Sequence, residues 1–98
     1  MDVVTIGDVM IDVRVEADAL EEGGDVHGHV LVRPGGSGAN AAVWAVHAGR
    51  TARVHGRVGN DVSGALVRDE LMERGVEPAL VVDHEHDTGT MLVVHEPG

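Results

Sequence analysis

One stretch decides the fold: Gly35-Gly36-Ser37-Gly38-Ala39-Asn40-Ala41-Ala42. Glycines before a helix let backbone N–H groups face a ligand, and the helix dipole adds a partial positive charge there. Asn40, in the expected first turn, offers both hydrogen-bond donors and acceptors. The stretch matches neither a phosphate-binding P-loop nor the dinucleotide glycine fingerprint. From these residues alone, a tight turn and a ligand-binding loop explain the pattern equally well.

Strands and helices alternate around this stretch. Residues 3–6 form a short apolar run, which is typical of a strand buried in a parallel sheet. Residues 39–48 predict a buried helix that ends at Gly49, with Trp44 in the core. Strands interspersed with helices predict right-handed crossovers and a parallel sheet covered by helices. The remaining expected elements are a strand over 50–56, a helix capped by Asn60 or Asp61 that runs to about Arg74 and ends at Gly75, and a strand over 79–82.

The second expected helix has an imperfect apolar stripe. Asp69 and Glu73 interrupt the arc that its apolar residues share, which is unusual for a helix packed on a sheet. The members of this arc are Val62, Ala65, Leu66, Met72 and Val76.

Two further segments alternate apolar and polar residues with period two. Residues 11–19 follow this pattern, and residues 29–33 fit a returning strand after a turn over 21–25. Residues 90–95 predict another strand, after a polar loop over 83–87. The alternating segments favour a half-exposed antiparallel flap, separate from the parallel sheet.

Composition narrows the classes of function. The 98 residues allow one domain or one piece of a larger one. Seventeen acidic residues oppose seven Arg and no Lys, and the formal charge of −10 disfavours binding to nucleic acid or to anionic membranes. No apolar run approaches the roughly 20 residues of a membrane span. The start of the chain lacks a basic leader, so we expect a cytoplasmic protein. Because Cys is absent, there is no disulfide framework.

Histidines gather in two places. His27-x-His29 and the run Asp83-His84-Glu85-His86-Asp87 place metal-capable side chains close together. A polar, acid-rich loop explains the second run better than a metal site does, and no metal site is predicted. Asp8 is expected to serve as a turn or cap residue.

The spacing of the glycines resembles a known family. Gly35-Gly36-x-Gly38-x-Asn40-x-Ala42, with Gly49 and Gly59 following at set intervals, resembles the amino-terminal signature of the ribokinase-like (PfkB) carbohydrate kinases. Three further segments resemble that family's first strand and sugar-binding turn, its second glycine-rich turn and its later lid strand. They are Ile6 to Asp12, Gly56 to Gly64, and Thr88-Gly89-Thr90.

The resemblance implies an α/β fold: a three-layer parallel sheet with flanking helices and a small β-sheet lid, truncated here. Residues 1–98 would be the amino-terminal part of the kinase domain, with lid strands within 11–33 and 88–96. Family members transfer the γ-phosphoryl group of ATP to a sugar hydroxyl, with magnesium. Asp12 matches the aspartate that accepts hydrogen bonds from the sugar, and Gly35, Gly36 and Asn40 match the loop that holds it.

Two departures limit what the resemblance implies. Ser37 and Met10 replace residues common in ribokinases proper, which argues against ribose. The family's Gly-Ala-Gly-Asp motif, with its catalytic base, does not occur, so this chain supplies no catalytic residue and is predicted to be inactive alone. ATP and magnesium would bind mainly outside it. The resemblance also implies a homodimer through the lid strands. A rival interpretation is a stand-alone, non-enzymatic module that binds a polyol or pairs through those strands.

Overall fold

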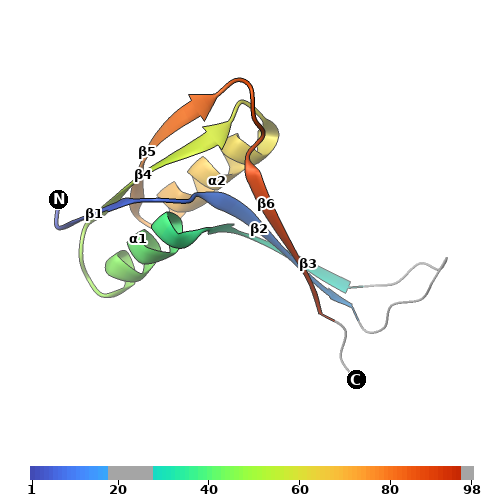
Figure 1. Ribbon diagram of the computed structural model, residues 1–98. Coiled ribbons are helices and arrows are strands. Elements are labelled where there is room, and N and C mark those ends of the chain that lie inside the picture. Colours follow the sequence, from blue (N-terminus) through green and yellow to red (C-terminus); the bar gives the residue numbers. More distant parts are fainter. Residues whose placement is uncertain (18–27, 96–98) are drawn as a thin grey trace.

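The computed structural model describes residues 1–17 and 28–95 (Figure 1). Two three-stranded sheets organise these residues: a main sheet of strand order β1-β4-β5 and a small sheet of strand order β3-β2-β6. The predicted α/β fold is therefore confirmed. The elements are β1 (Val3–Ile6), β2 (Met10–Ala17), β3 (Gly28–Gly35), α1 (Ser37–His47), β4 (Ala52–Gly59), α2 (Val62–Glu73), β5 (Val76–Asp83) and β6 (Gly89–His95).

The main sheet is parallel, as predicted, and both helices lie on one of its faces (Figure 1). Valines of β4 point into the core between that face and the helices, where Val54, Val67 and Leu71 are fully buried. The opposite face is uncovered in the described residues, and Ile6 there is 84% exposed. These residues thus supply the sheet and one of the expected helical layers.

The small sheet is mixed rather than antiparallel. β2 pairs with β3 in antiparallel register, but it pairs with β6 in parallel register, with Met10 opposite Gly89. The antiparallel pairing expected for the two alternating segments is therefore confirmed for β2 and β3. β6 runs parallel to β2 because both strands leave the carboxyl ends of main-sheet strands. Residues 18–27 and 96–98, which include the predicted turn and His27, lie outside the described part.

The helix ends agree with the sequence. Gly49 and Gly75 follow α1 and α2 with φ of 87° and 79°, as expected for helix-terminating glycines. The Asp61 carboxylate accepts a hydrogen bond from the Gly64 N–H at 2.7 Å, which makes it the predicted amino-terminal cap of α2. Within the described ranges, no helix has the length and apolar character needed to cross a membrane.

The buried faces of the two helices differ from the predictions. α2 buries Gly64, Val67 and Leu71, whereas Val62, at the start of the expected apolar arc, is exposed. The residues of α1 that pack on the sheet are small. Trp44 lies on the other side of the helix and is 69% exposed, and its ring contacts the His47 ring edge-on, with 5.6 Å between the ring centroids. The prediction of Trp44 as a core residue is wrong, because only small side chains allow α1 to approach the strands closely.

Candidate functional site

The site forms where β1 ends and α1 begins. The Asp8 carbonyl accepts hydrogen bonds from the N–H groups of Gly38 and Ala39, at 3.1 and 3.4 Å. The Thr5 hydroxyl donates to the Gly38 carbonyl at 2.8 Å. These bonds fix the first turn of α1 against the carboxyl end of β1. Asp8 caps the helix through its backbone, in line with the turn or cap role predicted for it.

Gly36 makes this approach possible. It occupies the amino-terminal cap position of α1 with φ of 89°, a conformation that side chains with a Cβ rarely adopt. A Cβ at this position would lie 2.4 Å from the Asp8 carbonyl oxygen. The second glycine of the stretch is therefore required by both the backbone angle and the space available.

Asp12 lies on β2 directly beside the glycine turn. It is half-buried and stands opposite Arg33 in the strand register. A Cβ added to Gly35 would lie 2.7 Å from the Asp12 Oδ1 atom, so the carboxylate rests against the bare Cα of this glycine. The sequence gives no reason by itself for these two residues to meet; the pairing of β2 with β3 brings them together.

Asn40 is the fourth predicted site residue. Its backbone N–H donates to the Gly36 carbonyl at 2.9 Å, while its side chain is exposed and makes no hydrogen bond to another described residue. A hollow of about 300 Å³ lies beside it, between β3 and α1, with Arg33 and Trp44 among its lining residues. The amide is thus available to a ligand.

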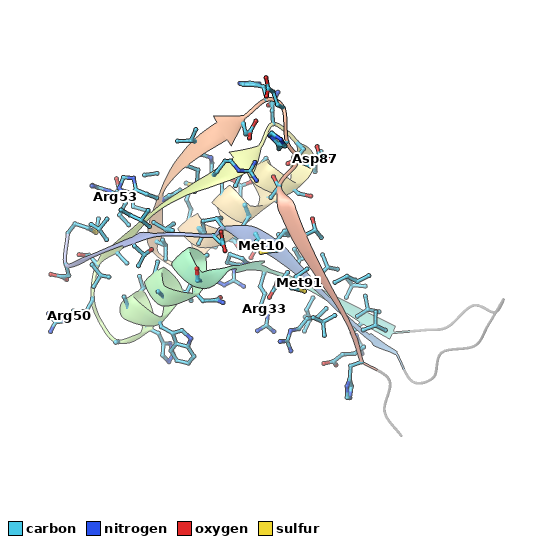
Figure 2. All side chains as sticks on the ribbon, viewed as in Figure 1. Met10, Arg33, Arg50, Arg53, Asp87 and Met91 are labelled. Atoms are coloured by element: carbon cyan, nitrogen blue, oxygen red, sulfur yellow. The ribbon has the colours of Figure 1, made fainter. Side chains whose placement is uncertain are left out.

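The structure brings the four predicted residues into one continuous arrangement, with Asp12 against Gly35 and Gly36 bonded to Asn40. Their role in binding sugar stays a prediction. Figure 2 shows Met10, Met91 and Arg33 gathered where the small sheet leaves the main sheet. Met91 stands opposite Asp12 across β2 and β6, and sequence reasoning missed it because the parallel register of β6 is not visible in the sequence.

A second hollow of about 300 Å³ lies on the other side of this junction. Its lining includes residues 7–10, Arg57 and Gly89. Arg57 also forms an ion pair with Asp83, at 3.3 Å. The junction is therefore open on two sides, one beside Asn40 and one beside Met10.

The acidic loop after β5 folds onto its own backbone. The Asp83 carboxylate accepts hydrogen bonds from the N–H groups of Glu85 and His86, and it lies 3.0 Å from His86 Nδ1. The Glu85 N–H is the main cause of an Asp83 pKa below its usual value. In the part of the chain that is described, no three His, Cys, Asp or Glu side chains form a group that could hold a metal ion.

ATP and magnesium, which the resemblance implies, do not fit the residues described here. The Gly38 and Ala39 N–H groups, which an anion at this helix end would need, already bond to Asp8. No carboxylate cluster suited to magnesium occurs in residues 1–17 or 28–95.

Comparison with known proteins places the chain in a family. Residues 1–98 match the pfkB family carbohydrate kinase domain. The fructokinase of Escherichia coli is 38% identical over 89 residues, which cover 90% of this chain and 26% of that enzyme. The chain thus spans about a quarter of the length of this curated relative.

Solved structures share the fold. A crystal structure of a putative ribokinase from Agrobacterium tumefaciens has a TM-score of 0.81 and 26% identity, covering 96% of this chain and 32% of that one. Phosphofructokinase-2 from Escherichia coli in complex with fructose-6-phosphate has a TM-score of 0.78 and 23% identity, covering 98% of this chain and 32% of that one. The match over the whole chain shows that the protein belongs to the pfkB family of carbohydrate kinases.

Proposed function

We propose that the chain is the amino-terminal, sugar-binding portion of an ATP-dependent kinase that transfers the γ-phosphoryl group to a sugar hydroxyl. One observation carries the proposal: the Asp12 carboxylate rests against Gly35 in the same arrangement that leaves the Asn40 amide without a partner among the described residues. Family membership supports the reaction class. The phosphoryl donor and the catalytic base would come from residues outside this chain.

The chemistry of the site suits a polyol. A carboxylate accepts hydrogen bonds from hydroxyl groups, and each such charged bond contributes about 1.5–3 kcal/mol. Asn40 adds a donor and an acceptor, and its side chain is exposed. The small sheet would act as the lid, closing over the sugar and excluding water that could otherwise accept the phosphoryl group.

Fructose is the first sugar to test. The name of the Escherichia coli relative is fructokinase, and that enzyme is 38% identical over the region shared with this chain. Ser37 and Met10 stand where ribokinases proper often carry other residues, which weighs against ribose. We propose a free ketohexose as the substrate class.

The test uses the full-length protein that contains this chain. Purified protein is offered ATP, magnesium and a panel of sugars, and formation of the sugar phosphate is followed by mass spectrometry. Phosphorylation of fructose supports the proposal. Absence of phosphorylation for every sugar, while a control kinase works in the same assay, contradicts it and favours the non-enzymatic module. The 98-residue chain alone is expected to be inactive, and turnover by it would contradict the assignment of the base to another segment.

The small sheet also favours contact with a second copy of the chain. One of its faces is aliphatic, and Val30 and Leu92 on that face are 63% and 61% exposed. The register aligns these residues with Val15 and Val13 of β2, which forms a continuous apolar surface. A structure of similar fold, from Escherichia coli, is described as the tetrameric inhibited form of phosphofructokinase-2.

Light scattering after size exclusion tests this pairing. The full-length protein is expected to be a dimer or larger, and Val30→Glu with Leu92→Glu should yield a monomer because both charges would be buried in the contact. An exposed control on the opposite face of the same sheet is Glu16→Ala, which should leave the assembly intact. A monomeric wild-type protein would contradict the pairing.

A further inference from the structure

A partly buried hydrogen-bond network joins the small sheet to the main body. Thr88 is the residue just before β6, and it is 6% exposed. Its hydroxyl accepts a hydrogen bond from the Gly59 N–H at 2.9 Å and donates to Asp61 Oδ1 at 2.6 Å. Its backbone N–H donates to Asp61 Oδ2 at 2.9 Å. We call these three bonds the Thr88 clamp.

The clamp ties three elements together at one point. Gly59 is the last residue of β4, and Asp61 is the amino-terminal cap of α2, where Oδ1 also accepts the Gly64 N–H. Both carboxylate oxygens are therefore used: Oδ1 accepts from the Gly64 N–H and the Thr88 hydroxyl, and Oδ2 accepts from the Thr88 N–H. No buried side-chain nitrogen or oxygen in the described ranges lacks a partner, so the network is complete.

The ionisation of Asp61 agrees with this geometry. Hydrogen bonds from the Thr88 hydroxyl and then from its N–H are the main causes that lower the pKa of Asp61. The carboxylate is thus the form that the clamp requires. A neutral amide in its place would point an NH₂ group at one of the N–H or O–H donors.

The clamp lies three residues before Met91, which stands opposite Asp12 of the candidate sugar site. Gly89, which follows Thr88, pairs with Met10. Two residues further along the same strands, Met91 pairs with Asp12. A Cβ on Gly89 would lie 3.2 Å from the Met10 Cγ, so β6 runs close against β2 at this point. The position of Thr88 therefore sets where β6 meets the strand that carries Asp12.

We propose that Asp61 is a positioning residue for sugar binding: through Thr88 it anchors the entry of β6, and through β6 it holds β2 with Asp12 in place over Gly35. The clamp fixes the first residue before β6 to β4 and to the start of α2. The effect on sugar affinity rests on the proposed function, whereas the anchoring of β6 can be measured without it.

Three substitutions separate anchoring from helix capping. Asp61→Ser keeps a good cap residue for α2 but removes the second oxygen that Thr88 needs. Thr88→Val keeps the shape and leaves the cap bond to Gly64 untouched, while it removes the hydroxyl. Thr88→Ser keeps the hydroxyl and should preserve the anchoring of β6. Asp69→Asn, an exposed aspartate on the same helix, is the matched control.

Two readouts are taken on the full-length protein. In hydrogen exchange, Asp61→Ser and Thr88→Val should each speed the exchange of amides in 89–95 by about tenfold, because the anchor of β6 is lost. In kinase assays, both should raise the sugar KM by about tenfold and leave the ATP KM unchanged, since the change acts on the strand beside Asp12. Thr88→Ser and Asp69→Asn should match wild type in both.

Each outcome decides the matter. Unchanged exchange in 89–95 would overturn the clamp. Faster exchange with an unchanged sugar KM, or with equal changes in both KM values, would overturn the positioning role. If the wild-type protein phosphorylates no sugar, the proposed function fails. Hydrogen exchange and calorimetric binding of fructose to the same variants then test the positioning role of Asp61. Fructose binding by Thr88→Val that is equal to or tighter than that of wild type contradicts this role.

Discussion

The two sheets use the same residue types for different purposes. In the main sheet, Val54 is fully buried beneath the helices, whereas in the small sheet Val30 is 63% exposed. The main sheet derives its stability from the helices that cover one face. The small sheet is held by strand pairing and by its junction with the main body, and this arrangement leaves it free to contact a ligand or a second copy. The buried core and the exposed apolar surface are thus located in different parts of one short chain.

The largest contrast should come from matched leucines. Leu71→Ala removes a fully buried side chain from the contact between α2 and the main sheet, and it should lower the free energy of unfolding by about 2–5 kcal/mol. Leu31→Ala, in the small sheet on the face opposite to the proposed contact, should change it by less than about 0.5 kcal/mol, since that side chain is exposed. Urea unfolding of the full-length variants measures both values. Equal losses would show that the small sheet is as well packed as the core.

Acid should weaken the junction of the sheets before it affects the aliphatic core. The pKa of Asp61 lies below its ordinary value of 3.8, mainly because of the Thr88 hydroxyl, and the pKa of Asp83 is lowered as well, mainly by the Glu85 N–H. A lowered folded-state pKa means that the stabilisation is complete above the ordinary value and is lost as the pH falls through the lowered one. Stability should therefore be level above about pH 5 and should fall below about pH 4.

Asp61→Asn checks the source of this acid sensitivity. The variant should be less stable than wild type at neutral pH, and its stability should depend less on pH between about 5 and 3. Denaturant unfolding at several pH values gives the comparison. A pH profile parallel to that of wild type would show that Asp61 does not contribute to the acid response.

A small, salt-dependent effect is expected on the uncovered face of the main sheet. Arg53 and Glu77 form an ion pair of 3.1 Å there, with both side chains at least one-third exposed. Arg53→Ala should cost no more than about 1 kcal/mol, and the cost should shrink in high salt, because solvent screens exposed charges. Unfolding midpoints at low and high salt test this. A larger, salt-independent loss would mean that the face is covered in the full-length protein.

Much of the fold could be predicted from the sequence. Alternation of short apolar runs with helices gave the parallel sheet, and the glycines at 49 and 75 marked the helix ends correctly. The buried sides of the helices could not be predicted as well. Trp44 is apolar and lies in an apolar helix, yet it faces outward because packing on the strands selects Ala39 and Ala42 for their small size.

The candidate site was predictable in its residues but not in its contacts. Asp12, Gly35, Gly36 and Asn40 came from the resemblance, and the structure adds that Asp12 rests against Gly35. The bonds of Thr88 join positions 27 and 29 residues apart, and no local pattern reports such a pairing. The parallel pairing of β6 with β2 was hidden for the same reason.

We propose above that Asp12 binds the sugar, and calorimetric titration of the full-length protein with fructose measures this binding. Asp12→Ala should weaken binding roughly 100-fold, the loss expected for one or two charged hydrogen bonds. Glu16→Ala, an exposed carboxylate four residues further along the same face of β2, should bind like wild type. Equal affinity of the Asp12→Ala variant and wild type would contradict the account.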